Sequence, residues 1–117
     1  MLLYSIMDTS GSMEISASLK THPLYDKWVL WAHLPHDTDW TLKSYKKIMA
    51  VKSIEEMVSL YSVIPEKLVK NCMLFIMRKG INPMWEDKQN RAGGCFSFKV
   101  GNKQVPQVWQ NLSYTLV

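Results

Sequence analysis

The chain has 117 residues with a formal net charge of +4 at pH 7; 47% of its residues are hydrophobic and 11% are aromatic. This length suits one small domain and excludes a second, and no apolar run approaches the roughly 20 residues of a membrane-spanning helix. The 14 basic residues, 12 of them lysine, favour an anionic partner by long-range attraction but fall short of the dense patches that coat duplex DNA.

Residues 5–21 are rich in Ser, Thr and Gly, which predicts a flexible N-terminal tail over 1–21, ahead of one domain at 22–117. The tail has no basic start and Asp8 interrupts its apolar stretch, so it does not match a secretory signal. The spacing of Cys72 and Cys95 fits neither a disulfide framework nor a zinc site, which predicts free thiols. We therefore expect a cytoplasmic protein, with the nucleus as a further location.

Two strands are expected first in the chain. Residues 26–34 alternate between two partly apolar faces, as a central strand does: Trp28, Leu30, Ala32 and Leu34 fall on one, and Val29, Trp31 and His33 on the other. A loop rich in turn residues follows at 35–40. Residues 42–51 form a weaker strand candidate, whose lysines suggest one solvated side.

The clearest helix is expected at 53–64. Ser53 is a favourable N-cap, and Glu56 three residues later completes a capping box. The apolar face has helical spacing and consists of Ile54, Met57, Val58 and Tyr61. Pro65 ends this helix or opens a short turn, and a strand with a long apolar centre follows over 71–79, before Gly80.

A loop over 81–94 leads to a fourth expected strand at 94–100. In this strand the apolar side chains of Phe96, Phe98 and Val100 would face inward. A tight turn at 101–104 precedes a helix from 105 onward, with Pro106 in its first turn. The order of elements predicts an α+β fold with an antiparallel sheet of four strands. Its sheet edge and a helix face would be uncovered, so we expect a missing part or a partner there.

Two tryptophans, Trp40 and Trp85, fall in loops beside acidic residues. A single such tryptophan is usually a core anchor, but two of them make a stacked ligand an equal alternative. A cationic aromatic ring between two indoles would gain about 1–3 kcal/mol per stacking contact and about 2 kcal/mol of cation–π attraction. Glu86 could accept two N–H donors from a guanine edge. Such a site would select an alkylated, positively charged guanine.

Residues 22–31 (HPLYDKWVLW), Trp40, residues 53–61 (SIEEMVSLY) and residues 80–94 (GINPMWEDKQNRAGG) resemble the eukaryotic translation initiation factor 4E family of messenger-RNA cap-binding proteins. The resemblance runs over about residues 22–117. It implies a curved antiparallel sheet backed by helices on its convex face. It also implies a 7-methylguanine ring stacked between Trp40 and Trp85, with Glu86 reading the guanine edge. Three further tryptophans match family core positions, namely Trp28, Trp31 and Trp109.

The resemblance covers little more than half of the usual domain. The later Arg and Lys that hold the cap phosphates in the family, and a third tryptophan near the methyl group, have no counterpart in the chain. Phosphate contacts would then fall to Arg91 and Lys88, or to the lysines between 43 and 52. For each of these lysines, a solvated surface role is the commoner alternative.

The partner-binding surface of the family resembles His22 and Pro23, together with the helix that carries Ile54 and Val58. Val58 stands where the family has an exposed tryptophan, and large aromatic anchors dominate interfaces of this kind. The last helix also carries Gln110 and Asn111 in place of the family's leucine and glutamate. We therefore expect weakened docking of initiation factor 4G-type and 4E-binding proteins.

Two functions remain open at this point. The first is a module that binds the cap of messenger RNA in translation initiation or its regulation. The second is a shortened interaction or decoy fragment of the same family, with weak or no cap binding. An enzyme is not expected, because the sequence has no ordering typical of a catalytic triad, no glycine-rich phosphate loop and no metal-ligand cluster. No cofactor is expected either.

Overall fold

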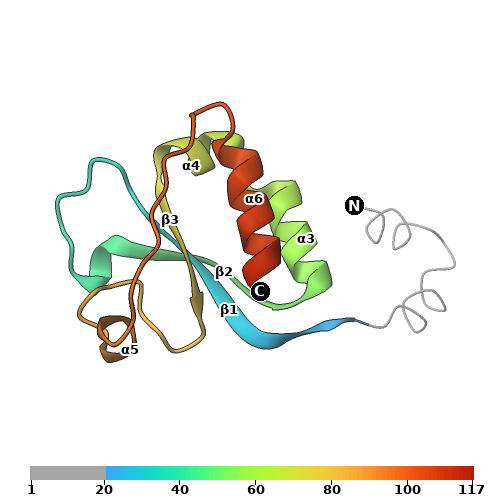
Figure 1. Ribbon diagram of the computed structural model, residues 1–117, viewed down its shortest axis with the longest axis horizontal. Helices are drawn as coiled ribbons and strands as arrows, with labels where there is room; N and C mark the ends of the chain where they lie inside the picture. The colour runs from blue at the N-terminus through green and yellow to red at the C-terminus, as the bar shows by residue number, and fades with distance from the viewer. Residues whose placement is uncertain (1–20) are drawn as a thin grey trace, which may run out of the picture.

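The computed structural model describes residues 21–117, so nearly all of the predicted flexible tail lies outside the described residues. The fold is α+β, with an antiparallel sheet and two main helices on one of its faces (Figure 1). The elements in chain order are β1 (Pro23–His33), η1 (Leu42–Ser44), β2 (Tyr45–Ser53), α3 (Ile54–Val63), α4 (Glu66–Asn71), β3 (Met73–Arg78), α5 (Lys88–Arg91) and α6 (Val105–Leu116).

The described sheet has three strands in the order β2-β1-β3, so β1 is central as the sequence predicts. Both of its neighbours are antiparallel to it: Leu30 lies across from Met49 of β2 and Ile76 of β3. Because side chains alternate along a strand, Leu30 points to the face that carries the helices and Trp31 to the other face. We call these the helix face and the open face of the sheet.

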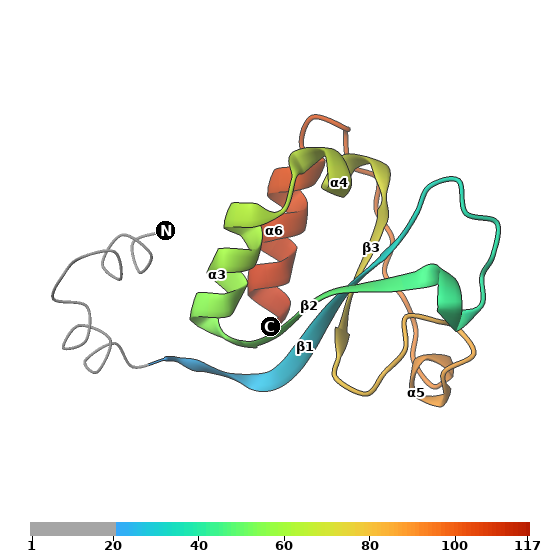
Figure 2. The same ribbon diagram turned by 180° about the vertical axis from the view of Figure 1, so that it is seen from behind.

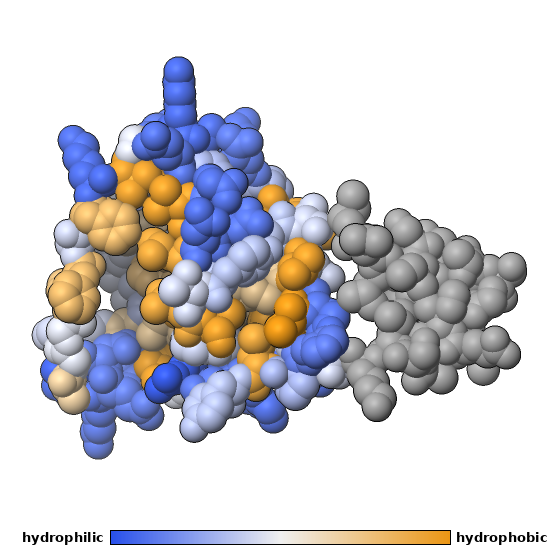
Figure 3. Space-filling model, turned by 45° about the vertical axis from the view of Figure 1, so that its right-hand side comes forward, coloured by the Kyte–Doolittle hydropathy of each residue, from blue (hydrophilic) through white to orange (hydrophobic). Residues whose placement is uncertain are grey.

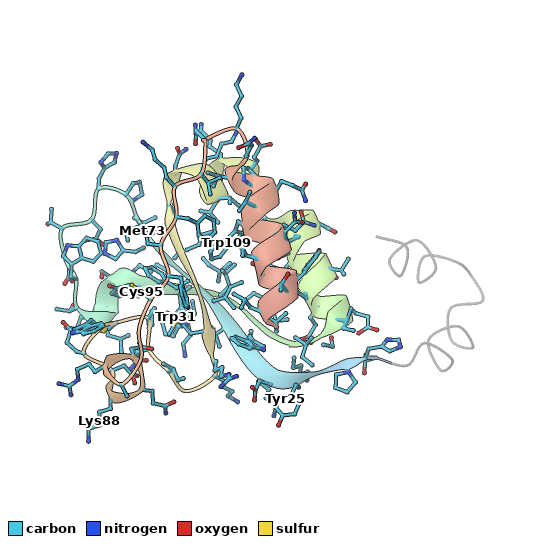
Figure 4. All side chains as sticks on the ribbon, in the orientation of Figure 1. Tyr25, Trp31, Met73, Lys88, Cys95 and Trp109 are labelled. Atoms are coloured by element: carbon cyan, nitrogen blue, oxygen red, sulfur yellow. The ribbon has the colours of Figure 1, made fainter. Side chains whose placement is uncertain are left out.

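The core lies between the helix face and α3. Leu30, Val51, Met57 and Leu60 are almost completely buried together, and Trp109 of α6 packs against this cluster. Trp109 projects from α6 toward the sheet (Figure 4), while α3 and α6 lie side by side in both ribbon views (Figure 1 and Figure 2). The Tyr61 hydroxyl of α3 donates a hydrogen bond to Ser113 of α6, which joins the two helices at their partly buried contact.

The start of α3 confirms the predicted cap. The Ser53 side chain accepts a hydrogen bond from the Glu56 amide at 3.2 Å, which satisfies one of the free amides of the first turn. The Glu56 carboxylate reaches back beyond the cap residue and accepts the Lys52 amide at 2.7 Å. After Pro65 the chain forms the short helix α4 rather than a simple turn.

The fourth strand expected at 94–100 is absent, and this prediction is wrong. The segment between α5 and α6 is irregular, with Phe96 fully exposed and Phe98 62% exposed (Figure 1). An alternating pattern indicates only that a segment suits a pleated surface, and a strand forms where its backbone also bonds to a neighbour. Phe98 and Val100 instead border a small pocket of about 300 Å³ whose other wall is α6.

Candidate functional site

A group of four aromatic side chains lies at the end of the sheet where β1 ends and β2 begins. It consists of His33, Trp40, Tyr45 and Phe75, which we call the aromatic cluster. The strand register brings them together, because His33 pairs with Tyr45 and its neighbour Trp31 pairs with Lys47 and Phe75. Tyr45 meets both His33 and Phe75 edge to face, at centroid distances of 5.0 and 5.7 Å.

Trp40 rests flat on His33. The two ring centroids are 4.0 Å apart and the planes differ by 1°, so one face of the indole is covered by the imidazole. His33 is only 1% exposed, and its Nε2 donates a hydrogen bond to the Asp39 carbonyl at 2.9 Å. Trp40 itself is 54% exposed. The structure therefore fixes one face of this indole and leaves the rest of the ring open to a ligand.

The loop that carries Trp40 is stabilised by its own aspartates. The Asp37 carboxylate accepts the Asp39 amide at 2.9 Å, and the Asp39 carboxylate accepts the Thr41 amide at 2.8 Å. The bond from Thr41 is the main reason that the pKa of Asp39 lies below its usual value of 3.8. These two acids, which precede Trp40 in the sequence, thus bind the backbone of the loop and by themselves indicate no ligand.

A second loop, residues 80–94, begins at Gly80, whose φ of 92° is a conformation that favours glycine. Its centre is held by two side chains. The Asp87 carboxylate accepts the amides of Asn82 and Gln89, at 2.9 and 3.0 Å, and these bonds lower the pKa of Asp87. The Asn90 side chain donates to the carbonyls of Asn82 and Met84, at 2.8 and 2.7 Å. We call Asp87 and Asn90 with these four bonds the loop brace.

The brace leaves Trp85 and Glu86 at the surface. Trp85 is 68% exposed, and Glu86 is exposed beside it. Burial raises the pKa of Tyr45, and the negative charge of Glu86 raises it further, so Glu86 lies within electrostatic reach of this member of the aromatic cluster. The two loops therefore bring Trp40 and Glu86 to the same end of the sheet.

Three of the residues that build this end were not predicted as site residues: His33, Tyr45 and Phe75. Alternation already places His33 on the same face as Trp31, next to the loop of Trp40, so that signal was available in the sequence. No sequence signal indicates that His33 stacks on Trp40, because the stack depends on how the 34–41 loop folds back over the strand.

The two residues expected to contact phosphate, Lys88 and Arg91, both lie on the short helix α5 and are exposed. Lys88 points away from the sheet into solvent (Figure 4). Neither takes part in an ion pair with another residue of the described range. Within residues 21–117 there is also no group of three or more His, Cys, Asp or Glu side chains that could hold a metal ion.

The four residues expected on the partner surface gather on the other side of the molecule. The Glu55 carboxylate accepts the His22 amide at 3.0 Å and contacts the His22 Nδ1 at 2.6 Å, which lowers the pKa of Glu55 to about 2. This contact holds His22 and Pro23 against the start of α3. Ile54 and Val58 are 49% and 42% exposed on the same helix.

Next to these residues lies an apolar groove of about 330 Å³, which we call the helix groove. It is lined by Leu24, Ile54, Met57, Val58, Tyr114 and Val117. Apolar side chains gather over the middle of this side of the molecule, with hydrophilic ones around them (Figure 3). Among residues 21–117, no helix is long and apolar enough to cross a membrane.

A sequence model of the eukaryotic initiation factor 4E family matches residues 23–117. The chain is 32% identical over 98 residues to human eukaryotic translation initiation factor 4E type 1B, a match that covers 82% of this chain and 40% of the relative. It is 33% identical over 104 residues to initiation factor 4E-2 of Schizosaccharomyces pombe, covering 80% and 41% of the two chains. The chain thus spans about 40% of the length of these curated relatives.

Solved structures agree with these matches. The C. elegans initiation factor 4E-3, in complex with the 4E-binding protein Mextli, superposes with a TM-score of 0.68 at 25% identity, covering 84% of this chain and 60% of that one. The Ascaris suum initiation factor 4E-3, solved with the m7G cap, gives a TM-score of 0.53 at 26% identity, covering 62% and 41%.

Proposed function

The chain belongs to the eukaryotic initiation factor 4E family, whose members are non-enzymatic proteins that bind the 7-methylguanosine cap of messenger RNA, and we propose that this chain binds the cap through Trp40, Trp85 and Glu86. The proposed role is in translation initiation or its regulation. The observation that carries the proposal is the flat stack of Trp40 on His33, which leaves the other face of the half-exposed indole free for a base.

The geometry supports a base that stacks on the free face of Trp40. A ring held there would continue the stack that His33 begins, and each indole contact is worth about 1–3 kcal/mol. Trp85 would cover the second face of the base. Methylation gives guanine a positive charge, and cation–π attraction adds about 2 kcal/mol in a desolvated site. Glu86 would accept the guanine N–H donors in charge-assisted hydrogen bonds.

Phosphate attraction is assigned to Arg91 and Lys88. Both lie on α5 in the same loop as Trp85, and the Gly93-Gly94 pair follows them. Their exposed charges can approach a phosphate chain that leaves the base, at the small energetic gain typical of solvated ions. We therefore expect their contribution to be smaller than that of the two tryptophans.

Intrinsic tryptophan fluorescence tests the proposal directly. Trp40 and Trp85 are exposed, whereas Trp31 is buried and Trp28 and Trp109 are half-buried, so a ligand between the loops quenches the exposed pair. We expect saturable quenching with 7-methyl-GTP and much weaker quenching with unmethylated GTP. Equal responses to the two nucleotides from a folded chain would refute a site that depends on methylation.

Matched variants assign the signal to residues. Trp85→Ala should lower cap affinity by about 1–3 kcal/mol, since it removes one stacking face. Tyr25→Ala is the control, because Tyr25 is 98% exposed and is also an aromatic residue of the described surface. Glu86→Gln should reduce discrimination between guanine and adenine cap analogues, because an amide is both donor and acceptor. Glu66→Gln on α4 controls for the loss of one exposed carboxylate.

A second candidate function is favoured by the helix groove. We propose that the groove, with His22, Pro23, Ile54 and Val58 at its border, receives a helical segment of an initiation factor 4G-type or 4E-binding protein. Related support comes from the C. elegans relative, which was solved with the 4E-binding protein Mextli. Valine at position 58 presents less apolar area than a large aromatic anchor, so we expect weak docking.

Calorimetry with a helical peptide from the 4E-binding region of a scaffold factor tests this second proposal. Val58→Asp should abolish binding, whereas Val63→Asp should not, because Val63 is 73% exposed on the same helix and lies outside the groove lining. Tight peptide binding by the unaltered chain would contradict the expected weakness of docking. Peptide binding without any response to 7-methyl-GTP would favour the interaction-fragment function over cap binding.

A further inference from the structure

Three lysines line one groove on the open face of the sheet, namely Lys27 of β1, Lys52 of β2 and Lys79 directly after β3. Lys27 and Lys79 are neighbours, because the Lys79 amide donates to the Lys27 carbonyl at 2.8 Å. Lys52 follows Val51, the partner of Trp28, at a point where the register of β1 and β2 is irregular. We call Lys27, Lys52 and Lys79 the lysine row.

The charges of the lysine row are not balanced by ion pairs within the described part of the chain. The three ion pairs there join His22 to Glu55, Lys70 to Glu66 and Arg78 to Asp26. Glu56 is the one acid that lines the groove, and its carboxylate accepts the Lys52 amide. Asp26, which borders Lys27 and Lys79 in a neighbouring pocket, pairs with Arg78. Like charges close together on a sheet repel one another, so a bound anion would relieve this repulsion.

The row borders a groove of about 790 Å³ on the sheet, large enough for an extended ligand. A fourth lysine, Lys47, also lines it, with its Nζ 5.1 Å from the centre of the Trp31 ring. Lys27, Val29, Trp31 and His33 alternate along β1 on this same face. The groove therefore extends from the lysine row to Trp31 and Lys47, and His33 of the aromatic cluster is the next residue of β1 on this face. His33 lies six positions after Lys27 along the strand, a distance of roughly 20 Å.

We propose that this groove binds the sugar-phosphate backbone of single-stranded RNA, in the nucleotides that follow a cap held at Trp40. The inference rests on the proposed cap-binding function and extends it to a residue set on the sheet itself. Lysine suits phosphate as a mobile point charge and reads no base edge. Trp31, the groove ring that Lys47 covers, is only 7% exposed. A base therefore cannot stack on this ring. The contact is therefore independent of sequence.

Counterion release gives the expected size of the effect. Each phosphate contact on a single strand contributes a slope of about −0.7 in log affinity against log salt concentration. Three contacts contribute a slope of about −2, which corresponds to a loss of roughly 20-fold in affinity between 50 and 200 mM salt. A capped RNA of ten nucleotides should bind more tightly than the cap dinucleotide at low salt, and this gain should fade as salt rises.

The test compares two triple variants of the whole chain. The first replaces the row, Lys27→Ala, Lys52→Ala and Lys79→Ala. The control replaces three lysines outside the groove lining, Lys67→Ala, Lys99→Ala and Lys103→Ala, and so has the same net charge. Affinities are measured by fluorescence anisotropy for the capped RNA, the uncapped RNA and the cap dinucleotide, each over a salt series. All six lysines are exposed, and thermal unfolding verifies that both variants fold.

We expect the row variant to lose the gain of the long capped RNA and about 2 units of salt slope, while the control retains most of both. Equal losses in the two variants would overturn the proposal, because net charge alone would then explain the attraction. Absence of any gain from RNA length in the unaltered chain would overturn it as well. If the affinity for uncapped RNA depends on the lysine row while the cap dinucleotide does not bind, the proposed role of the row is supported and the proposed cap-binding function fails. Unchanged dinucleotide binding in the row variant supports both.

Discussion

The two loops at the end of the sheet hold their tryptophans in different ways. Trp40 is fixed through its ring, which lies flat on the buried His33. Trp85 has no such ring contact among the aromatic pairs of the described residues, and its loop is fixed through the backbone by Asp87 and Asn90. One indole is therefore positioned by packing and the other by hydrogen bonds. The position of Trp40 should therefore tolerate the loss of hydrogen bonds in its loop, whereas the position of Trp85 should not.

Removing the support under Trp40 should give the largest effect. His33→Ala deletes a buried ring and its bond to the Asp39 carbonyl, which should lower the free energy of unfolding by about 2–4 kcal/mol. Trp40 would lose its stacking partner, so cap affinity should fall together with stability. Chemical denaturation followed by fluorescence measures the first effect, and titration with 7-methyl-GTP measures the second.

Two further variants distinguish the contribution of the His33 ring stack from that of its hydrogen bond to Asp39. His33→Phe retains a flat ring under Trp40 and loses only the bond to Asp39, so its cost should be about 1 kcal/mol. His36→Ala, at an exposed histidine of the same loop, should change neither quantity. If His33→Phe were as damaging as His33→Ala, the hydrogen bond rather than the stack would position Trp40.

Removing the brace under Trp85 should give an intermediate effect. Asp87→Ala leaves the Asn82 and Gln89 amides without their acceptor, which loosens this loop locally. Because the loop lies at the surface, we expect faster hydrogen exchange at these two amides and weaker cap binding, with a smaller change in global stability than for His33→Ala. Asp37→Ala is the control, since Asp37 accepts one amide in the other loop. A larger loss of cap affinity in that control would reverse the comparison.

Acid should loosen both loops, but unequally. The pKa values of Asp39 and Asp87 are lowered below 3.8 by backbone hydrogen bonds. A lowered pKa means that the stabilisation is fully present above the unfolded-state value, near 3.8, and is lost as pH falls through the folded-state value. The Asn90 side chain has no proton to gain in this range, so the Trp85 loop keeps two bonds. Amide chemical shifts of Thr41, Asn82 and Gln89 should therefore move only below about pH 3.8, and titration well above it would contradict this assignment.

The sequence predicts the architecture where local rules decide it. The central strand, the Ser53 cap and the start of α3 follow from alternation and capping, and the structure confirms them. The strand expected at 94–100 is wrong for a reason that no pattern within those residues contains. Its alternation is genuine, but the segment does not bond to β3, and Phe96 is exposed. Pairing depends on the neighbouring edge, which is a property of the tertiary structure.

The candidate site is predicted in part for similar reasons. The acids beside the two loop tryptophans direct attention to Trp40, Trp85 and Glu86. The sequence pattern alone, however, does not distinguish acids that contact a ligand from acids that support the loop. In the structure Asp37, Asp39 and Asp87 bind backbone amides, and Glu86 is the one exposed beside Trp85. His33 could not be assigned as a support from sequence, because its stack on Trp40 depends on the path of the connecting loop.

The smallest effect tests whether the two loops meet at all. Burial raises the pKa of Tyr45 and the charge of Glu86 raises it further, because a second negative charge opposes ionisation of the phenol. Glu86→Gln should lower that pKa only part of the way toward 10.0, since burial remains. NMR titration of ring-labelled tyrosine measures it, and Glu66→Gln on α4 should leave Tyr45 unchanged. Because Tyr45 contacts both His33 and Trp40, an unchanged value in Glu86→Gln would place Glu86 away from the aromatic cluster. The carboxylate would then be too far to read a base that stacks on Trp40, and edge recognition would need another acceptor.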